Sequence, residues 1–265
     1  VLASHFQLML QYRAAAIAGF ATQCWWGAIK IMVFAAYFAS GAGPQPMSLA
    51  NAVTYIWLGQ ALLVLLPWGG DPEVAEMVRS GAVSYERLRP VDTHTLWFCR
   101  SLSSMVARVL PRAALMVLTA GVLMPLVGLG EWGLPPPTGL AAGAWFGLSI
   151  LSTLLLSSAI RVLLTIVVVA SLTDRGVNTL ATPMINIFSG SIIPIAFYPD
   201  WLVPFMRLQP LAGLADTPFR IYFGEVTGPD AAAAIALQLF WAATLVVLGR
   251  IWLGRTMQTL QVQGG

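Results

Sequence analysis

The sequence has 265 residues, of which 58% are hydrophobic and only 9% are charged. Soluble domains carry about 25% charged residues, so this composition excludes an ordinary soluble protein and indicates an integral membrane protein. The formal net charge of +3 is small, and two cysteines, Cys24 and Cys99, are too few to predict a disulfide framework or a metal site.

Long apolar runs predict an all-α polytopic membrane protein with one transmembrane domain over residues 1–265. A transmembrane helix needs about 20 predominantly apolar residues. Six runs approach or exceed this length, and polar or proline-rich turns separate them. The predicted spans are 14–39, 52–69, 102–129, 139–172, 179–195 and 231–253.

Two of these spans contain unusual residues. Lys30, the only lysine, lies in the first span, where it could either extend toward the membrane surface or face the bundle interior. Arg161 lies in the inner half of the fourth span with no acid nearby in the sequence. The fourth span also has three glycines at GxxxG spacing, which predicts a face for close helix packing. These glycines are Gly139, Gly143 and Gly147.

The long polar interval 71–100 separates the second span from the third. Asp71 can cap a helix, Pro72 suits its first position, and Gly81 is a plausible end. Between them, apolar residues recur at helical spacing, so one face is apolar and the other charged. We expect an amphipathic helix on the cytoplasmic membrane surface, followed by a tight elbow; an ordinary solvated loop is the alternative. The apolar face consists of Val74, Met77 and Val78.

The fifth span is interrupted by proline, glycine and asparagine. The 196–225 segment that follows has apolar pieces near 201–208 and 218–223, each too short to cross a bilayer. We expect two short helices that dip into the outer leaflet as a re-entrant hairpin, because irregular backbone at membrane depth must be buried in protein or line a wet cavity. The interrupting residues and their successors are Pro183, Asn186, Gly190, Pro194, Pro199 and Trp201.

Six spans place both termini on one side, and the arginines indicate which side. With the N-terminus inside, eleven of the 14 lysine and arginine residues fall on the cytoplasmic side, whereas Arg207 and Arg220 fall outside and Lys30 lies within a span. This bias predicts that both termini are cytoplasmic. The eleven are Arg13, Arg79, Arg87, Arg89, Arg100, Arg108, Arg112, Arg161, Arg175, Arg250 and Arg255.

The sequence lacks the motifs of several catalytic classes. It has no GxxxxGK[ST] phosphate loop, no HExxH metal motif and no GxSxG nucleophile elbow. His5 and His94 lie in no ligand pattern. No acid lies in the middle of a predicted span, which argues against a carrier driven by an ion gradient.

Three segments resemble the membrane subunits of ABC-2 type ATP-driven exporters. They are the approach to the first span at 9–27, the SGAVSYERLRPVDTHTLWFCR stretch at 80–100, and GSIIPIAFYPDWLVPFMRLQP at 190–210. With the six spans, the resemblance covers nearly the whole chain. The first two segments are similar to a branch often found as paired permeases with a separate ATPase. Lys30 and Arg161 match no motif of the family.

The resemblance implies a bacterial cell-membrane subunit that is not itself an enzyme and forms half of an export path. Two copies of an ATP-binding subunit would hold ATP and Mg²⁺, and a related permease, or a second copy, would complete the path amid membrane lipids, with no nucleic acid. The broken fifth span and its outer helices would form the external gate. An ion-gradient transporter or a non-transporting scaffold remain alternatives. The expected ATPase-coupling residues are Val74, Met77, Val78, Gly81, Tyr85, Glu86, Arg87, Arg89 and Pro90.

Overall fold

The computed structural model describes residues 13–41, 43–82, 91–171 and 173–259. These residues are largely helical and contain no β-strand, which confirms the all-α prediction. Length and composition identify three of the six predicted crossings as helices able to span a membrane. These three are Thr93–Leu126, Leu140–Ser171 and Gly228–Gln258.

The first two predicted spans differ in length. Helix α2 (Arg13–Ser40) is close to the predicted 14–39, whereas α3 (Leu49–Ala61) ends eight residues before the predicted 69. Ser48 caps α3 by accepting a hydrogen bond from the Asn51 amide. Thirteen residues of α-helix extend only about 20 Å, less than the ~30 Å hydrocarbon core. The chain continues as a 3₁₀ turn, η1 (Leu63–Leu65), and then leaves helical geometry.

The third apolar helix begins earlier than the predicted 102. Asp92 caps α6 (Thr93–Met116) by accepting a hydrogen bond from the Thr95 amide. The helix continues through a π-helical segment, η2 (Val117–Leu123), and ends as α7 (Met124–Leu126). The Ala120 carbonyl within η2 accepts a hydrogen bond from the Leu134 amide, so the loop after α7 folds back against the π-helical turn.

Helices α8 (Leu140–Ser171) and α12 (Gly228–Thr259) pack along one another, and α8 is the more buried of the two. A buried polar group joins them. Gln238 on α12 accepts a hydrogen bond from Ser149 on α8 and donates to Thr153 Oγ1 and to the Gly213 carbonyl. Because every partner is buried, this network fixes the 3₁₀ turn η5 (Pro210–Leu214) against both long helices.

Helix α9 (Asp174–Phe188) is shorter and begins earlier than the predicted fifth span. It ends where Gly190 adopts a φ of +80°, a left-handed conformation that favours glycine. The following segment contains η4 (Ile195–Phe197), α10 (Val203–Leu208), η5 and α11 (Asp216–Tyr222). The two short helices expected in 196–225 are therefore present as α10 and α11.

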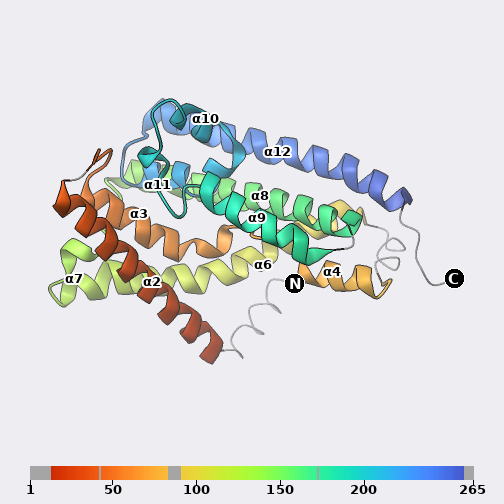
Figure 1. The fold of residues 1–265 in the computed structure, drawn as a ribbon, viewed down its shortest axis with the longest axis horizontal. Helices are drawn as coiled ribbons and strands as arrows, with labels where there is room; N and C mark the ends of the chain where they lie inside the picture. The colour runs from red at the N-terminus through yellow and green to blue at the C-terminus, as the bar shows by residue number, and fades with distance from the viewer. Residues whose placement is uncertain (1–12, 42, 83–90, 172, 260–265) are drawn as a thin grey trace.

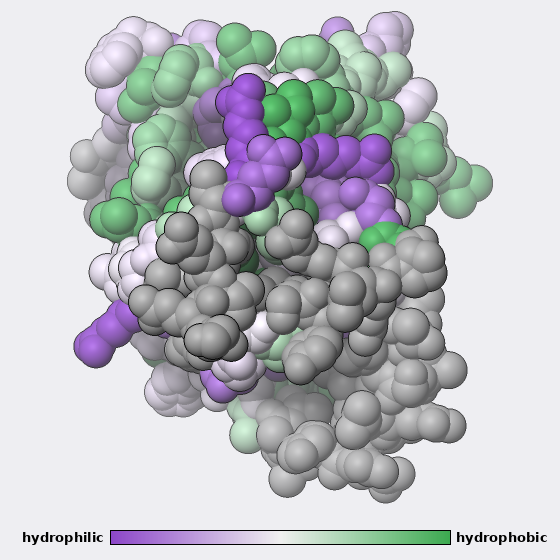
Figure 2. Space-filling view, turned by 90° about the vertical axis from the view of Figure 1, so that its right-hand side faces the viewer, coloured by the Kyte–Doolittle hydropathy of each residue, from purple (hydrophilic) through white to green (hydrophobic). Residues whose placement is uncertain are grey.

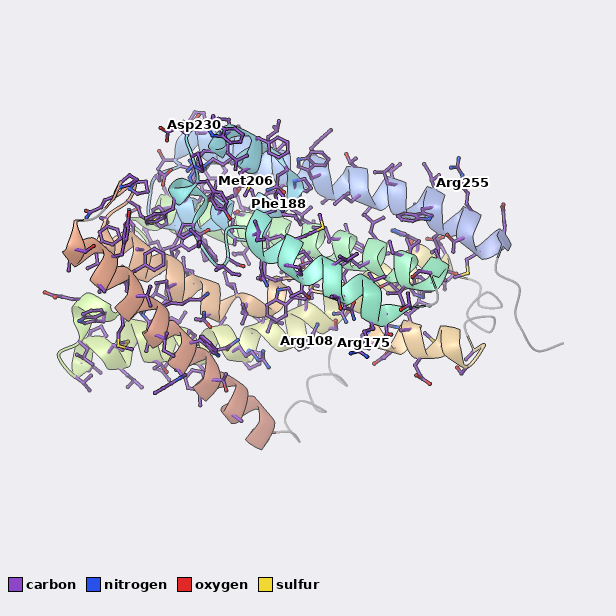
Figure 3. All side chains as sticks on the ribbon, in the orientation of Figure 1. Arg108, Arg175, Phe188, Met206, Asp230 and Arg255 are labelled. Atoms are coloured by element: carbon purple, nitrogen blue, oxygen red, sulfur yellow. The ribbon has the colours of Figure 1, made fainter. Side chains whose placement is uncertain are left out.

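The two ends of the bundle differ in composition. Figure 1 shows α4 (Pro72–Arg79) near the C-terminal end of α12, and shows α7, α10 and α11 at the opposite end. Figure 3 places Arg175 and Arg255 toward the end that contains α4, which we call the α4 end, and Asp230 toward the other. Viewed from the α4 end, hydrophilic residues gather between hydrophobic ones (Figure 2).

Candidate functional site: an arginine-lined cavity beside helix α4

A cavity of about 250 Å³ lies where α6 and α8 meet the chain that follows α3. Three arginines line it, Arg108 and Arg112 from α6 and Arg161 from α8, and we call it the arginine cavity. The other lining residues are mostly apolar, so the arginines supply its charge. These residues are Leu63, Val64, Leu66, Pro67, Trp68, Gly69, Gly70 and Met105.

Helical spacing explains why Arg108 and Arg112 share this cavity. Residues four apart on an α-helix lie on the same face with Cβ atoms about 5–6 Å apart. Met105, a buried residue one turn before them, packs with Leu65 and Leu154 and holds this face of α6 against η1 and α8. Contact between α6 and α8 then brings Arg161 to the same place.

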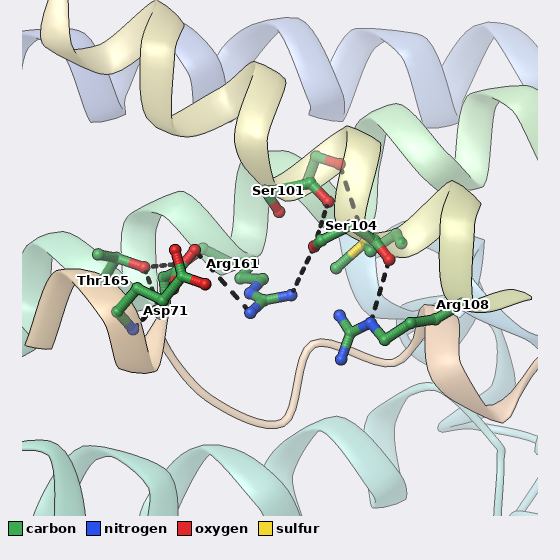
Figure 4. A network of polar contacts seen from close by, with 9 residues as sticks. Asp71, Ser101, Ser104, Arg108, Arg161 and Thr165 are labelled. Carbon is green, nitrogen blue, oxygen red and sulfur yellow. Dashed lines mark hydrogen bonds and ion pairs between the residues drawn. The ribbon is translucent and has the colours of Figure 1, made fainter. Parts of the chain in front are cut away.

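Asp71 pairs with Arg161, the arginine for which the sequence offers no neighbouring acid. The Asp71 carboxylate lies 4.0 Å from Arg161 Nη2, and the two side chains are only 11% and 12% exposed. Arg161 Nη1 also donates to Ser104 Oγ at 3.3 Å (Figure 4). A charge buried among apolar helices is costly unless it is paired, so this contact accounts for Arg161 in an apolar helix.

The backbone beside Asp71 is attached to α8 as well. The Asp71 amide donates to Thr165 Oγ1 at 2.8 Å, and the Thr165 hydroxyl donates to the Arg161 carbonyl at 2.8 Å. The Asp71 carboxylate also accepts a hydrogen bond from the Glu73 amide at 3.0 Å, which starts α4 as the capping prediction requires. One aspartate thus begins α4 and joins it to α8.

The remaining two arginines have no comparable acid. Arg108 Nε donates to the Ser104 carbonyl at 3.1 Å, and Arg112 lies close enough to α2 that a Cβ on Gly19 would be 3.4 Å from its Nη2 atom. Across the described ranges, neither Arg108 nor Arg112 forms an ion pair. Three guanidinium groups therefore meet a single carboxylate at the arginine cavity.

The apolar face of α4 packs against its own chain. Val74 is fully buried, and Met77 packs beside it against residues from α6, α8 and α12. Val74 therefore anchors α4 to the bundle and cannot contact a partner directly, which corrects the expectation for this residue. The partner contact expected of Met77, which is partly exposed, stays a prediction. The surrounding cluster consists of Trp97, Val162, Ile166, Val169 and Leu253.

The rest of the predicted coupling element is only partly described. Gly81 has a φ of +74° just after the end of α4 at Arg79, in agreement with its predicted role as a helix end. Pro72 and Glu73 are exposed on the outer side of α4. The side chain of Val78 lies outside the described residues, as do Tyr85, Glu86, Arg87, Arg89 and Pro90.

The 66–70 segment connects the cavity to α8 and α9. Trp68 Nε1 donates to Asn186 Oδ1 at 3.1 Å, and the Trp68 carbonyl accepts a hydrogen bond from Thr182 at 3.1 Å. On the other side, a Cβ on Gly70 would lie 3.0 Å from Thr165 Cα, so glycine permits close approach to α8. This segment forms one wall of the cavity and contacts both helices.

The predicted outer-gate residues extend from α9 to the chain after η4. Pro183 and Asn186 lie within α9, and Gly190 follows it, where its carbonyl accepts a hydrogen bond from Tyr55 at 3.1 Å. Trp201 is 79% exposed. The other two residues, Pro194 and Pro199, flank η4.

Lys30 meets the chain just beyond Gly190. Its ammonium group donates to the Ser191 carbonyl at 3.3 Å, and the lysine is partly buried. Of the two alternatives that the sequence leaves open, the structure therefore has Lys30 facing the bundle. This hydrogen bond connects α2 with the turn that ends α9.

The described residues also contain a second charge group, far from the arginine cavity along the bundle. Arg207 and Arg220 each lie 3.6 Å from Asp216, whose side chain is 2% exposed, and Arg220 Nε lies 2.7 Å from Glu225. Arg207 Nη2 approaches Glu225 at 3.5 Å. Burial raises the pKa of Asp216 to about 6, although Arg220 and Arg207 act in the opposite direction. We call these four residues the outer charge cluster.

Within the part of the chain that the structure describes, no helix packs against the glycines at GxxxG spacing. A Cβ at Gly139 or Gly147 would meet nothing within 4 Å among the described residues, and one at Gly143 would meet only Pro137, at 3.7 Å. The predicted close-packing face is therefore open in the single chain. Helices α8 and α12 associate through the Gln238 network and apolar residues instead.

Sequence reasoning missed the pairing of Asp71 with Arg161, two residues far apart in the chain. The available signal was an arginine in an apolar run, which requires a buried partner, together with an acid at the membrane end of the preceding loop. In comparisons with known proteins, no family model and no curated protein match this chain.

Proposed function

We propose that this chain is the transmembrane subunit of an ATP-driven exporter of the ABC-2 type, driven by a separate ATPase subunit. Its three long apolar helices and the ABC-2-like segments support this class. The chain would form half of the export path, beside a related permease or a second copy of itself. ATP and Mg²⁺ would be bound by two copies of the ATPase subunit.

The proposed topology has six crossings in a bacterial cell membrane, with both termini in the cytoplasm. The crossings would be made by α2, by α3 together with η1 and the 66–70 segment, by α6 with α7, and by α8, α9 and α12. The 196–225 segment would form the re-entrant outer element. In this orientation the α4 end faces the cytoplasm. The arginine bias of the sequence supports the orientation.

The attachment of α4 to the bundle is the observation that carries this proposal. Val74 is buried among residues of α6, α8 and α12, and Asp71 binds Arg161 and Thr165 on α8. Close-packed protein interiors have low compressibility and transmit displacement. A force on the outer side of α4 would therefore move long helices and would not be absorbed by a loose loop.

The same contacts suggest how the movement would spread. The 66–70 segment is hydrogen bonded to α9 through Trp68, so displacement of α4 would act on α9 as well as α8. Helix α9 ends at Gly190, next to the outer segment. Closure of the ATPase pair would then tilt these helices and open the outer end of the path.

Purification with and without ATP tests the class. The chain, isolated from its native membrane in mild detergent, should retain an ATPase, and the reconstituted complex should show vanadate-sensitive hydrolysis. The double variant Glu86→Ala/Arg89→Ala should keep a folded bundle but lose the coupling of hydrolysis to transport. The double variant Asp174→Ala/Arg175→Ala, which alters an acid and an arginine in the first turn of α9, is the matched control.

Three outcomes would oppose the proposal. Coupled hydrolysis unchanged in Glu86→Ala/Arg89→Ala would remove the coupling element from its proposed role. Uptake into vesicles driven by an ion gradient without ATP would indicate a secondary transporter. A chain that retains no ATPase and moves no solute would be a scaffold.

A further inference from the structure

We propose that the arginine cavity binds a phosphate group, either the headgroup phosphate of an anionic phospholipid or a free phosphate ion. The inference requires only that the chain lies in a membrane, and it stands whether or not an ATPase drives the protein. It rests on three features of the cavity, which are its charge, its donor geometry and its depth.

The charge of the cavity is not balanced by the described chain. Asp71 pairs with Arg161, whereas Arg108 and Arg112 have no carboxylate partner among the residues that the structure describes. Arg108 and Arg112 are both partly buried, so a large part of each arginine side chain is removed from water. Unpaired charges at the edge of a hydrocarbon core are costly, and an anion in the cavity would offset that cost.

The donors converge in a manner suited to an oxyanion. Guanidinium groups present planar pairs of N–H donors that match phosphate oxygens, and these bonds are short and strong because both partners are charged. Arg108 on α6 and Arg161 on α8 approach from two directions (Figure 4). Arg112, from the same helix as Arg108, also lines the cavity. A cavity of about 250 Å³ exceeds the ~30 Å³ share of one water several times over.

The depth of the arginines agrees on two separate helices. From Leu126 at the end of α7 back to Arg108 is about 27 Å, and from Leu140 at the start of α8 to Arg161 is about 32 Å, at 1.5 Å per residue. Both lengths approximate the ~30 Å hydrocarbon thickness. If the α7 end lies at one headgroup layer, the arginines lie at the other.

The surface beside the cavity could accept an acyl chain. Leu115 is three residues after Arg112 and seven after Arg108, so it shares their face of α6, and it is 39% exposed. Trp68, at the cavity wall, is 38% exposed, and tryptophan is enriched at membrane interfaces. A phospholipid with its phosphate at the arginines would lay its tail over this apolar surface, and basic pockets between helices commonly hold anionic headgroups.

Native mass spectrometry and thermal unfolding of the full chain test the proposal. The protein is reconstituted in nanodiscs with equal phosphatidylglycerol and phosphatidylcholine, and retained lipid is counted after release. The cavity variant Arg108→Gln/Arg112→Gln removes two unpaired charges. The control variant Arg175→Gln/Arg255→Gln removes the same charge from the α4 end without altering a cavity residue.

We expect the wild type and the control to retain phosphatidylglycerol over phosphatidylcholine, and the cavity variant to lose at least about tenfold of that preference. A second arm adds sodium phosphate, against sodium chloride of equal ionic strength, to lipid-stripped protein. If phosphate raises the unfolding temperature of the wild type but not of the cavity variant, free phosphate is a ligand. If phosphate has no such effect while the wild type retains phosphatidylglycerol selectively, the lipid is the ligand.

Equal lipid preference in the cavity and control variants, with no phosphate effect in either, would overturn the proposal. An equal loss in both would do the same, because it would indicate general attraction to basic residues. If the double cavity variant aggregates, Arg112→Gln against Arg175→Gln repeats the comparison with one charge removed from each.

Discussion

The arginine cavity and the outer charge cluster both gather arginines from distant parts of the chain, but they differ in charge balance. The outer charge cluster sets two arginines against two acids within 3.6 Å. The arginine cavity sets three arginines against one acid and leaves about 250 Å³ of space beside them. In the outer charge cluster each arginine is paired with acids and stabilises the fold, whereas the arginine cavity has arginines that remain available for a ligand.

Breaking the one ion pair of the cavity should have the largest effect. Asp71→Ala leaves Arg161 buried without its carboxylate, and loss of one partner of a buried pair costs about 3 kcal/mol or more. Chemical unfolding in detergent, followed by tryptophan fluorescence, measures the change in unfolding free energy. The double variant Asp71→Asn/Arg161→Gln removes both charges and should recover part of the loss; a double variant no more stable than Asp71→Ala would contradict the pairing.

Filling the contact between the cavity wall and α8 should cost somewhat less. In Gly70→Ala the new Cβ would lie 3.0 Å from Thr165 Cα, a backbone atom with little freedom to move. Overpacking of this kind costs about 1–3 kcal/mol, and the same unfolding measurement would detect it. A neutral Gly70→Ala would show that the 66–70 segment is not held closely against α8.

Acidification should distinguish the outer charge cluster. The pKa of Asp216 is raised from 3.8 to about 6, so the native protein binds this proton more tightly than the unfolded chain does. The contribution of Asp216 to stability is therefore largest below pH 4 and is lost as the pH rises through 6. The protein should gain about 1 kcal/mol from this residue between pH 6 and pH 5.

Asp216→Asn should remove this component of the pH profile, whereas Asp200→Asn, at an exposed acid of the same outer segment, should keep it. Parallel profiles for wild type and Asp216→Asn would mean that the cluster stays ionised over this range.

The smallest expected effect concerns the open glycine face of α8. Gly147→Ala meets nothing within 4 Å and should stabilise the isolated chain by about 0.5–1 kcal/mol through helix propensity. Thermal unfolding of the purified chain measures this gain. A loss of stability in a purified dimer, with a gain in the monomer, would show that another subunit occupies this face.

Local signals predicted local structure well. The Asp71–Pro72 start of α4 and the left-handed Gly81 after its end both follow from capping chemistry over a few residues. The two short helices α10 and α11 agree with the prediction made from prolines and short apolar segments. Such features depend on neighbours in sequence, so composition and spacing are sufficient to find them.

Features that depend on contacts between distant segments could not be predicted. The sequence could not pair Asp71 with Arg161, because the partner is set by the packing of the 66–70 segment on α8. The amphipathic pattern also led us to expect Val74 at a partner interface, because such a pattern does not say whether the apolar face contacts lipid, a partner or the same chain. The arginine cavity lies where α6, α8 and the 66–70 segment meet. It therefore depends on contacts between distant segments as well, and was missed for that reason.

The early end of α3 has a consequence for how the cavity forms. Past Ala61 the α-helical hydrogen bonds give way to the short 3₁₀ turn η1, and hydroxyl groups of other helices bind two of the freed carbonyls. Ser157 donates to the Leu65 carbonyl and Thr182 to that of Trp68. A full-length helix there would fill the volume between α6 and α8. The space of the proposed anion site therefore results from the early end of α3, and serine and threonine hydroxyl groups bind the carbonyls that this end leaves exposed.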